Sequence, residues 1–236
     1  MKTIHHPANK RGGSHHGWFK SKHTFSFADY YDRARVGFGV LKVINDDHIE
    51  GGHGLSSHSH RNMEIVSIPL SGTLLHKDNI GNESVINSGE IQIMSAGTGV
   101  VHSESNASSE IPVKFLQIWL EPDKKDVTPR YQQVSIIDLL NRNEFAQVLS
   151  PNADDAGVWI HQNGWFNVGE FEKGVTKTYT LNDSSNGVYV FVISGSVIID
   201  DNVLQPRDGL GITETDKFKM DVIANAQLLV MEVPMG

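Results

Sequence analysis

The chain has 236 residues and a net charge of −8 when histidine is counted as neutral, which is enough length for one large domain or two small ones. An acidic chain without a run of Lys and Arg is not expected to bind nucleic acid, because phosphate contacts need a basic surface. The absence of cysteine excludes disulfides, iron–sulfur clusters and cysteine-based zinc sites. There is no signal-like apolar core and no long apolar segment, so we expect a cytoplasmic protein without a membrane span.

Short runs rich in Val, Ile, Leu and Phe, separated by Gly, Asn, Asp and Pro, predict strands along the whole chain. In chain order the predicted strands are 37–44, 63–70, 72–76, 89–94, 113–120, 158–161, 187–194, 195–200 and 226–233. One short helix is predicted, near 136–147. Many short strands with frequent turn residues indicate an all-β protein built as a barrel or sandwich.

A weak internal repeat relates the two halves of the chain. LSGTLLHKDN (70–79) aligns with ISGSVIIDDN (193–202), which pairs Gly72 with Gly195. Further along, each copy reaches another glycine that opens an apolar run. Two related β-barrels are the simplest explanation of this order.

The boundary between the barrels is predicted near 121–130, a charged stretch that contains proline and lies between apolar runs. One barrel is therefore expected over 1–125 and the second over 126–236. Because two barrels of one chain can pack on each other, we expect a monomer.

Two pairs of polar residues share the spacing i, i+2. His58 and His60 lie in SSHSH, and His102 and Glu104 lie in VHSES. Side chains at i and i+2 of a strand point to the same face, roughly 6.6 Å apart. If the two strands are neighbours that face a barrel interior, three imidazoles and one carboxylate converge. Such a set suits a divalent transition metal (Fe, Mn, Co, Ni, Cu or Zn) and leaves coordination positions open.

A lone His-x-His is commonly a solvated pair in a loop, so the second pair is what favours a metal site. The distribution of histidine agrees, since only His161 lies after position 102. The equivalent positions in the second copy of the repeat cannot build such a site, and these positions are Leu181, Asp183, Val222 and Ala224. The metal is therefore expected in the N-terminal barrel.

These residues lie in stretches that resemble a known family. GHGLSSHSHRNME, which starts at Gly52, resembles the first cupin motif, and GEIQIMSAGTGVVHSESN resembles the second. The ending His-Ser-Glu is similar to the pirin family of bicupins. HGWFKSKHTFSFADYYD, VINDDHIEGG and TPRYQQ resemble the bacterial pirin-type quercetinases in particular. The resemblance covers nearly the whole chain, and it is specific over 16–133 and loose after about 150.

The resemblance implies two tandem cupin-type β-barrels with a short helix. It carries the family's metal ligands onto His58, His60, His102 and Glu104, the four residues that the spacing selected. The sequence departs from common family patterns at Ser57 and Ser59 around the histidine pair and at Ser95 before the second motif's glycine, and none of these serines replaces a ligand.

The resemblance implies a metal-dependent dioxygenase that takes a small flavonol-like aromatic substrate and dioxygen, opens the flavonol ring and releases carbon monoxide. Glu104 would then serve as general base as well as ligand. Two alternatives stay open. The protein could be a redox-sensing module that binds a protein partner without turnover, or the metal could be purely structural.

Four other residues bear on the site. Glu64 occupies the glutamate position of the first cupin motif and would share the strand parity of His60 if the strand is unbroken, so it is either a ligand or a supporting residue. His76 is predicted to be a surface residue at a strand end, and His53 could border the pocket. Substitution of His161 is expected to leave metal content unchanged.

Overall fold

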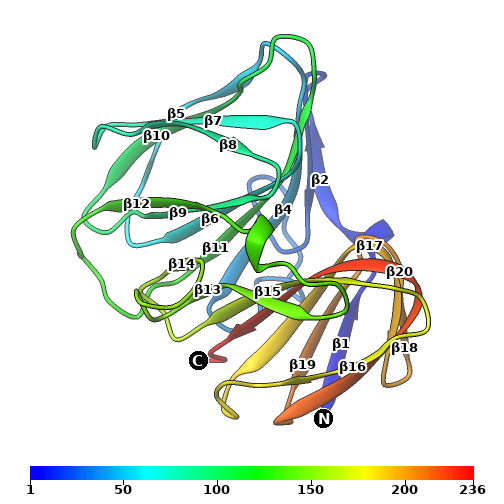
Figure 1. Ribbon diagram of the computed structural model, residues 1–236. Coiled ribbons are helices and arrows are strands. Elements are labelled where there is room, and N and C mark those ends of the chain that lie inside the picture. Colours follow the sequence, from blue (N-terminus) through cyan, green and yellow to red (C-terminus); the bar gives the residue numbers. More distant parts are fainter.

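The structure, a computed structural model, describes residues 1–236. Twenty strands and two 3-10 helices, η1 (Ala8–Lys10) and η2 (Ile137–Leu139), form two barrel-like halves. Figure 1 shows the N-terminal half above the C-terminal half; the chain starts in the lower half, in dark blue, passes to the upper half and returns to the lower half in green. The predicted all-β bicupin fold is confirmed. No helix is long and apolar enough to span a membrane.

The N-terminal half contains eleven strands. They are β2 (Gly12–His15), β3 (Phe19–His23), β4 (Leu41–Ile49), β5 (Gly54–His60), β6 (Glu64–Ser71), β7 (Thr73–Asp78), β8 (Glu83–Asn87), β9 (Glu90–Ser95), β10 (Val100–Asn106), β11 (Val113–Leu120) and β12 (Arg130–Ser135). A seven-stranded sheet has the order β12-β9-β6-β11-β4-β3-β2, and a four-stranded sheet has the order β5-β10-β7-β8. The two sheets face each other and enclose the barrel interior (Figure 1).

The C-terminal half is one nine-stranded sheet that curves on itself. Its strands are β1 (Lys2–His6), β13 (Phe145–Ser150), β14 (Val158–Trp159), β15 (Trp165–Phe171), β16 (Thr176–Thr180), β17 (Gly187–Ile199), β18 (Asn202–Leu204), β19 (Gly209–Thr213) and β20 (Lys217–Val233). The order is β1-β19-β17-β20-β15-β13-β14, with β16 paired to β20 and β18 paired to β17.

Two strands lie in the half opposite to the one that their place in the sequence suggests. β1 pairs with β19 of the C-terminal sheet, and β12 pairs with β9 of the N-terminal sheet. Each exchanged strand covers a sheet edge that would otherwise expose unpaired backbone groups. The domain boundary after residue 125 stays a proposal. β1 precedes this boundary but belongs to the C-terminal sheet, and β12 follows it but belongs to the N-terminal sheet.

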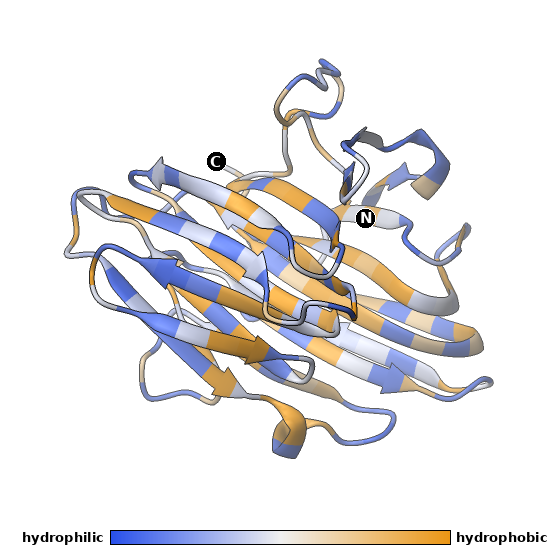
Figure 2. Cartoon of the chain, turned by 90° about the horizontal axis from the view of Figure 1, so that it is seen from above, coloured by the Kyte–Doolittle hydropathy of each residue, from blue (hydrophilic) through white to orange (hydrophobic).

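The apolar core lies mainly between the halves and inside the C-terminal barrel. A cluster of 24 buried residues joins the two halves, and one of 16 fills the C-terminal barrel. The N-terminal barrel holds only two small clusters, of five and three residues. Polar and apolar residues alternate along many strands (Figure 2). The N-terminal barrel therefore has room for polar side chains in its interior.

The two glycines that the internal repeat pairs have the same local geometry. Gly72 and Gly195 have φ angles of +73° and +75°. A Cβ would lie 2.6 Å from the Pro112 carbonyl oxygen at Gly72 and 1.9 Å from the Asn225 carbonyl oxygen at Gly195. Both positions therefore require glycine, at the point where the chain turns closely past a neighbouring strand.

The helix predicted over 136–147 is wrong beyond the single turn of η2. Asn143 adopts a left-handed conformation, with φ +65°, and its backbone N–H donates to the Glu170 carbonyl. From Phe145 the chain continues as β13, where it pairs with β15. The apolar residues of this segment are drawn into the sheet, so tertiary pairing overrides the local helical pattern.

Candidate metal centre and adjoining pocket

Three histidines converge between neighbouring strands of the four-stranded sheet. β5 and β10 are antiparallel, and His102 lies directly opposite His58. Ring centroids are 4.4 Å apart for His58 and His102, and 4.9 Å apart for His60 and each of the other two. One nitrogen of each ring lies within 4.8 Å of the other two, which is the arrangement of a metal-binding group. The alternation of burial along β10 places His102 and Glu104 on the same inward face.

The hydrogen bonds of these rings leave one nitrogen of each ring without a partner. His58 Nδ1 bonds the Ser56 carbonyl at 2.8 Å, so Nδ1 carries the proton and Nε2 is free. His60 Nε2 and His102 Nε2 are buried without any hydrogen-bond partner. Burial, followed by the charge of His58, lowers the pKa of His60 to about 4, and burial with the neighbouring histidines lowers the pKa of His102 to about 3. These two rings are neutral near pH 7, as metal ligation requires.

Glu104 is buried next to this group but is not part of the three-histidine set. Ser67 Oγ donates to its Oε1 at 3.3 Å, and Gln117 Nε2 donates to its Oε2. Burial raises the pKa of Glu104, against the lowering effect of the Gln117 hydrogen bond. On the β5 side, the pairing shifts register between His102 and Glu104, because β5 carries an extra residue there.

A row of polar side chains crosses the large sheet beneath Glu104. His23, Asn45, Gln117, Ser67 and Gln92 lie opposite one another on consecutive strands. All five are buried, although they are polar. Sequence reasoning missed this row, because it depends on the register of five strands. The one local signal was the polar Asn-Asp-Asp stretch in the middle of β4, directly after Val43 and Ile44.

A pocket of about 260 Å³ opens beside the histidines. Its lining residues are Phe19, Phe27, Asn45, Asp47, Leu55, Ser56, His58, Gln117 and Trp119. The Trp119 ring contacts both His60 and Phe27 edge-on, at centroid distances of 4.8 and 5.3 Å. Trp119 Nε1 donates to Gln117 Oε1 at 3.3 Å, which orients the Gln117 amide toward Glu104. Aromatic faces and a few polar groups therefore share one concave surface, as is typical of a small-molecule site.

Two acceptor oxygens in this pocket have no partner. Asn45 Oδ1 and Asp47 Oδ1 are buried and unbonded. Burial, with a further contribution from Glu104, raises the pKa of Asp47 to about 8. A buried polar atom without a partner is costly, and both of these residues line the pocket wall.

The structure corrects two expectations about neighbouring residues. Glu64 is buried on the opposite face of its strand, where its Oε2 accepts from Ser95 Oγ at 2.8 Å and the His161 backbone N–H at 3.4 Å. The strand is interrupted after His60 by Asn62, with φ +48°, so the expected parity is lost. His76 is not a surface residue, because it is only 1% exposed and its Nδ1 lies 3.4 Å from His102 Nδ1.

His53 and His161 lie outside the cluster. The His53 ring stacks on Trp18 with a centroid distance of 5.4 Å. The His161 ring packs edge-on against Trp159 in the C-terminal half.

Comparison with known proteins assigns both halves. The family model described as Pirin matches residues 5–120, and the one described as Quercetinase C-terminal cupin domain matches residues 147–233. The chain is 38% identical over 227 residues to a protein named Quercetin 2,3-dioxygenase from Escherichia coli K12, with 96% of each chain covered. It is 34% identical to a Pirin-like protein from Caulobacter vibrioides, covering 96% of this chain and 97% of the relative.

A comparison with solved structures gives the same assignment. The crystal structure of the bacterial pirin YhhW from Escherichia coli in complex with nickel(II) superposes with a TM-score of 0.93 at 36% identity, with 100% of each chain covered. By sequence over nearly its whole length and by fold, the chain belongs to the pirin family.

Proposed function

We propose that His58, His60, His102 and Glu104 hold one divalent transition metal ion in a dioxygenase that opens a flavonol ring. The donor set fits such an ion, since three imidazoles offer free or unpartnered nitrogens and a buried carboxylate lies on the same strand face as His102. The nickel complex of the related YhhW supports the metal part of this proposal, and the name of the Escherichia coli K12 relative supports the reaction.

When bound, the metal would supply Lewis acidity that favours the deprotonated form of an enolic hydroxyl and, for any of these ions except Zn²⁺, a redox-capable centre for dioxygen chemistry. The chain's own contribution is to bind the substrate, orient it and remove a proton. His58 lines both the metal centre and the pocket, so a substrate in the pocket reaches the centre past this ring.

Glu104 is suited to take the proton of the substrate's enolic hydroxyl. Its burial raises the pKa above that of an ordinary carboxyl, which makes its ionised form a stronger base. Gln117 and Ser67 each donate to it, and Gln117 is itself held by the Trp119 N–H. This chain of hydrogen bonds keeps the carboxylate in one orientation while the proton is transferred.

The pocket favours a flat phenolic substrate. Phe19, Phe27 and Trp119 provide aromatic contact surface for a planar ring system. Asn45 and Asp47 place an amide and a carboxyl group in the pocket wall, and these would hydrogen-bond ring hydroxyls, which an apolar aromatic compound cannot supply. A polyhydroxylated aromatic such as a flavonol satisfies both features.

One observation carries this proposal: unpartnered histidine nitrogens converge at the wall of an aromatic pocket, beside a buried carboxylate. The test is to load metal-free protein separately with iron, manganese, cobalt, nickel, copper or zinc, and to follow quercetin absorbance together with carbon monoxide release. Turnover with at least one metal, with carbon monoxide formed, is expected. Stoichiometric metal without turnover under any loading would contradict the enzyme and favour the partner-binding alternative.

A further inference from the structure

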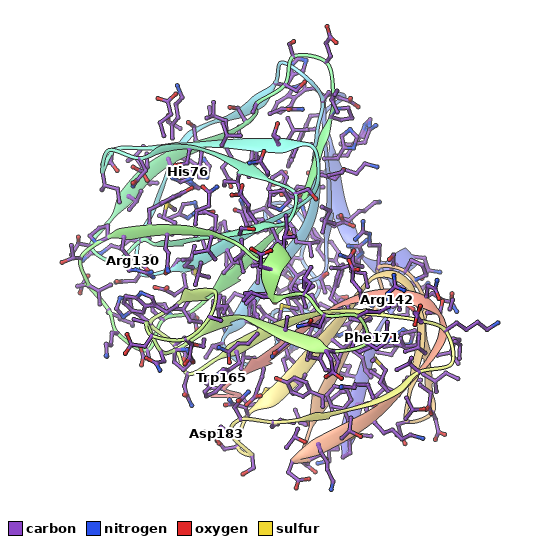
Figure 3. All side chains as sticks on the ribbon, viewed as in Figure 1. His76, Arg130, Arg142, Trp165, Phe171 and Asp183 are labelled. Atoms are coloured by element: carbon purple, nitrogen blue, oxygen red, sulfur yellow. The ribbon has the colours of Figure 1, made fainter.

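A fourth histidine and an aspartate lie directly behind the three histidines of the candidate metal centre. β7 pairs with β10 on the side opposite β5, so that His76 faces Glu104 and Asp78 faces His102. The side chains of His76 and Asp78 are 1% and 0% exposed. In Figure 3, His76 lies within the N-terminal barrel, near the strands that carry the centre. Neither residue lines the pocket beside His58.

Hydrogen bonds link the candidate ligand His102 to Asp78 through His76. The Nδ1 atoms of His102 and His76 are 3.4 Å apart, and His76 Nε2 lies 2.9 Å from Asp78 Oδ2. Asp78 Oδ1 also accepts the backbone N–H groups of Ile80 and Asn82, at 3.1 and 2.9 Å. The Tyr131 ring packs against His76 at a centroid distance of 4.9 Å, which holds the imidazole in place.

The positions of the protons follow from this chain. Asp78 accepts at both oxygens, so it is an ionised acceptor and His76 Nε2 must donate to it. In the form of His76 that carries a single ring proton, that proton lies on Nε2, so Nδ1 can only accept and His102 Nδ1 must donate. His102 therefore keeps its own lone pair on Nε2, the atom that is buried without a partner.

We propose that His76 and Asp78 are positioning residues that hold His102 in the tautomer whose Nε2 can bind metal. This inference rests on the proposed metal centre, and it adds two residues that contact neither metal nor substrate. An outer hydrogen-bond partner of this kind fixes the orientation and tautomer of a ligating histidine and raises its basicity. Here the carboxylate acts through an intervening imidazole.

The substitution Asp78→Asn reverses the proton order. The asparagine carbonyl is held by the two backbone N–H groups that Asp78 Oδ1 accepts, so its NH₂ group faces His76 Nε2 and the side-chain amide of Asn82. Asn82 Nδ2 donates to Asp78 Oδ2 at 2.9 Å in the wild type, and its amide turns its oxygen toward the new NH₂ group. His76 must then accept at Nε2 and carry its proton on Nδ1. His102 Nδ1 becomes the acceptor, and the His102 proton moves to Nε2, where it blocks the metal.

The experiment has two readouts that do not depend on turnover. The first is nitrogen NMR of isotope-labelled histidine in metal-free protein at about pH 8, above the ordinary pKa of imidazole, because protonated and bare ring nitrogens differ widely in chemical shift. The second is calorimetric titration with Ni²⁺. We expect a bare Nε2 on His102 in the wild type, a protonated Nε2 in Asp78→Asn, and Ni²⁺ affinity weakened about 10- to 100-fold in that variant.

Asp183→Asn is the matched control, because Asp183 also accepts a backbone N–H and an asparagine amide, at Ser185 and Asn163. Asp183 lies in the C-terminal half, far from His76 in Figure 3. It should leave the tautomer and the affinity as in the wild type. A protonated His102 Nε2 in the wild type, or an unchanged tautomer or affinity in Asp78→Asn, would overturn the proposal, as would an equal effect of the control.

His76→Phe provides a second route if Asp78→Asn does not fold. The phenyl ring keeps the contact with Tyr131 but removes the acceptor, so both tautomers of His102 should appear and Ni²⁺ affinity should fall by a similar factor. A single, wild-type tautomer in this variant overturns the proposal. Wild-type protein that binds no metal at all would instead refute the metal centre, while the His102 ring nitrogens would still test the hydrogen-bond chain.

Discussion

The substitution Gln117→Leu removes the amide that joins Glu104 to Trp119. Gln117 is 5% exposed, and its Nε2 donates to the buried Glu104 carboxylate while its Oε1 accepts from Trp119 Nε1. Leucine has a similar size, so packing is largely kept and the polar interactions are what is lost. The carboxylate then retains a single donor, Ser67, at the longer distance of 3.3 Å.

The cost follows from the kind of hydrogen bond that is lost. A hydrogen bond to a charged group is worth about 1.5–3 kcal/mol, and Trp119 is half-buried and can partly bond water. We therefore expect metal-free Gln117→Leu to lose about 2–3 kcal/mol of unfolding free energy near pH 8. Ser67→Ala should lose about 1 kcal/mol, because it removes a longer bond to the same carboxylate.

The pH dependence gives a second check. Burial already raises the pKa of Glu104, and loss of Gln117 raises it further because the hydrogen bond that favours the charged form is gone. The carboxyl can then take up a proton as pH falls, which relieves the unpaired charge. The destabilisation measured by urea unfolding should thus be smaller at about pH 5 than at about pH 8. Equal stabilities of wild type and variant at about pH 8 would refute this role of Gln117.

Further substitutions test the rest of the site. His102→Ala should lose most bound metal and all oxygenase activity. Its metal affinity should fall by more than the roughly 100-fold that loss of an outer hydrogen-bond partner causes. His161→Ala should bind as much metal as the wild type in metal analysis. Glu104→Gln should keep some metal but turn over quercetin about 10²- to 10⁴-fold more slowly, and wild-type turnover would exclude the role as base. Burial raises the pKa of Asp47 from 3.8 to about 8, so the folded protein binds more protons than the unfolded chain in this range. The unfolding free energy of the metal-free wild type, relative to that of Asp47→Asn, should therefore fall as pH rises between these values, by up to about 1.4 kcal/mol per pH unit. Parallel pH profiles of the two metal-free proteins would contradict this.

The candidate ligands were predictable because they depend on a local rule. Side chains two apart on a strand share a face whatever the strand pairs with, so the patterns His-Ser-His and His-Ser-Glu placed each pair correctly on one side. The same rule failed for Glu64. Asn62, in a left-handed conformation, interrupts the strand between His60 and Glu64. The alternation of side chains between the two faces therefore does not carry over from His60 to Glu64.

Residues that act across strands were not predictable from the chain alone. Gln117 and Ser67 reach Glu104 only because β11 and β6 are in one particular register. His76 contacts His102 because β7 lies next to β10, and nothing in LLHKDN distinguishes such a histidine from an exposed one.

By itself, the sequence determined the fold class, the repeat of two barrels and the two polar pairs. These features depend on the alternation of side chains along a strand and on glycine in tight turns, and both act over only a few residues. The tertiary structure alone decided the exchange of β1 and β12, the loss of the helix after Leu139, and the buried hydrogen bonds around Glu104 and His102. These depend on which strands become neighbours and in what register. That choice is made by the burial of the whole apolar core, summed over residues far apart in the chain.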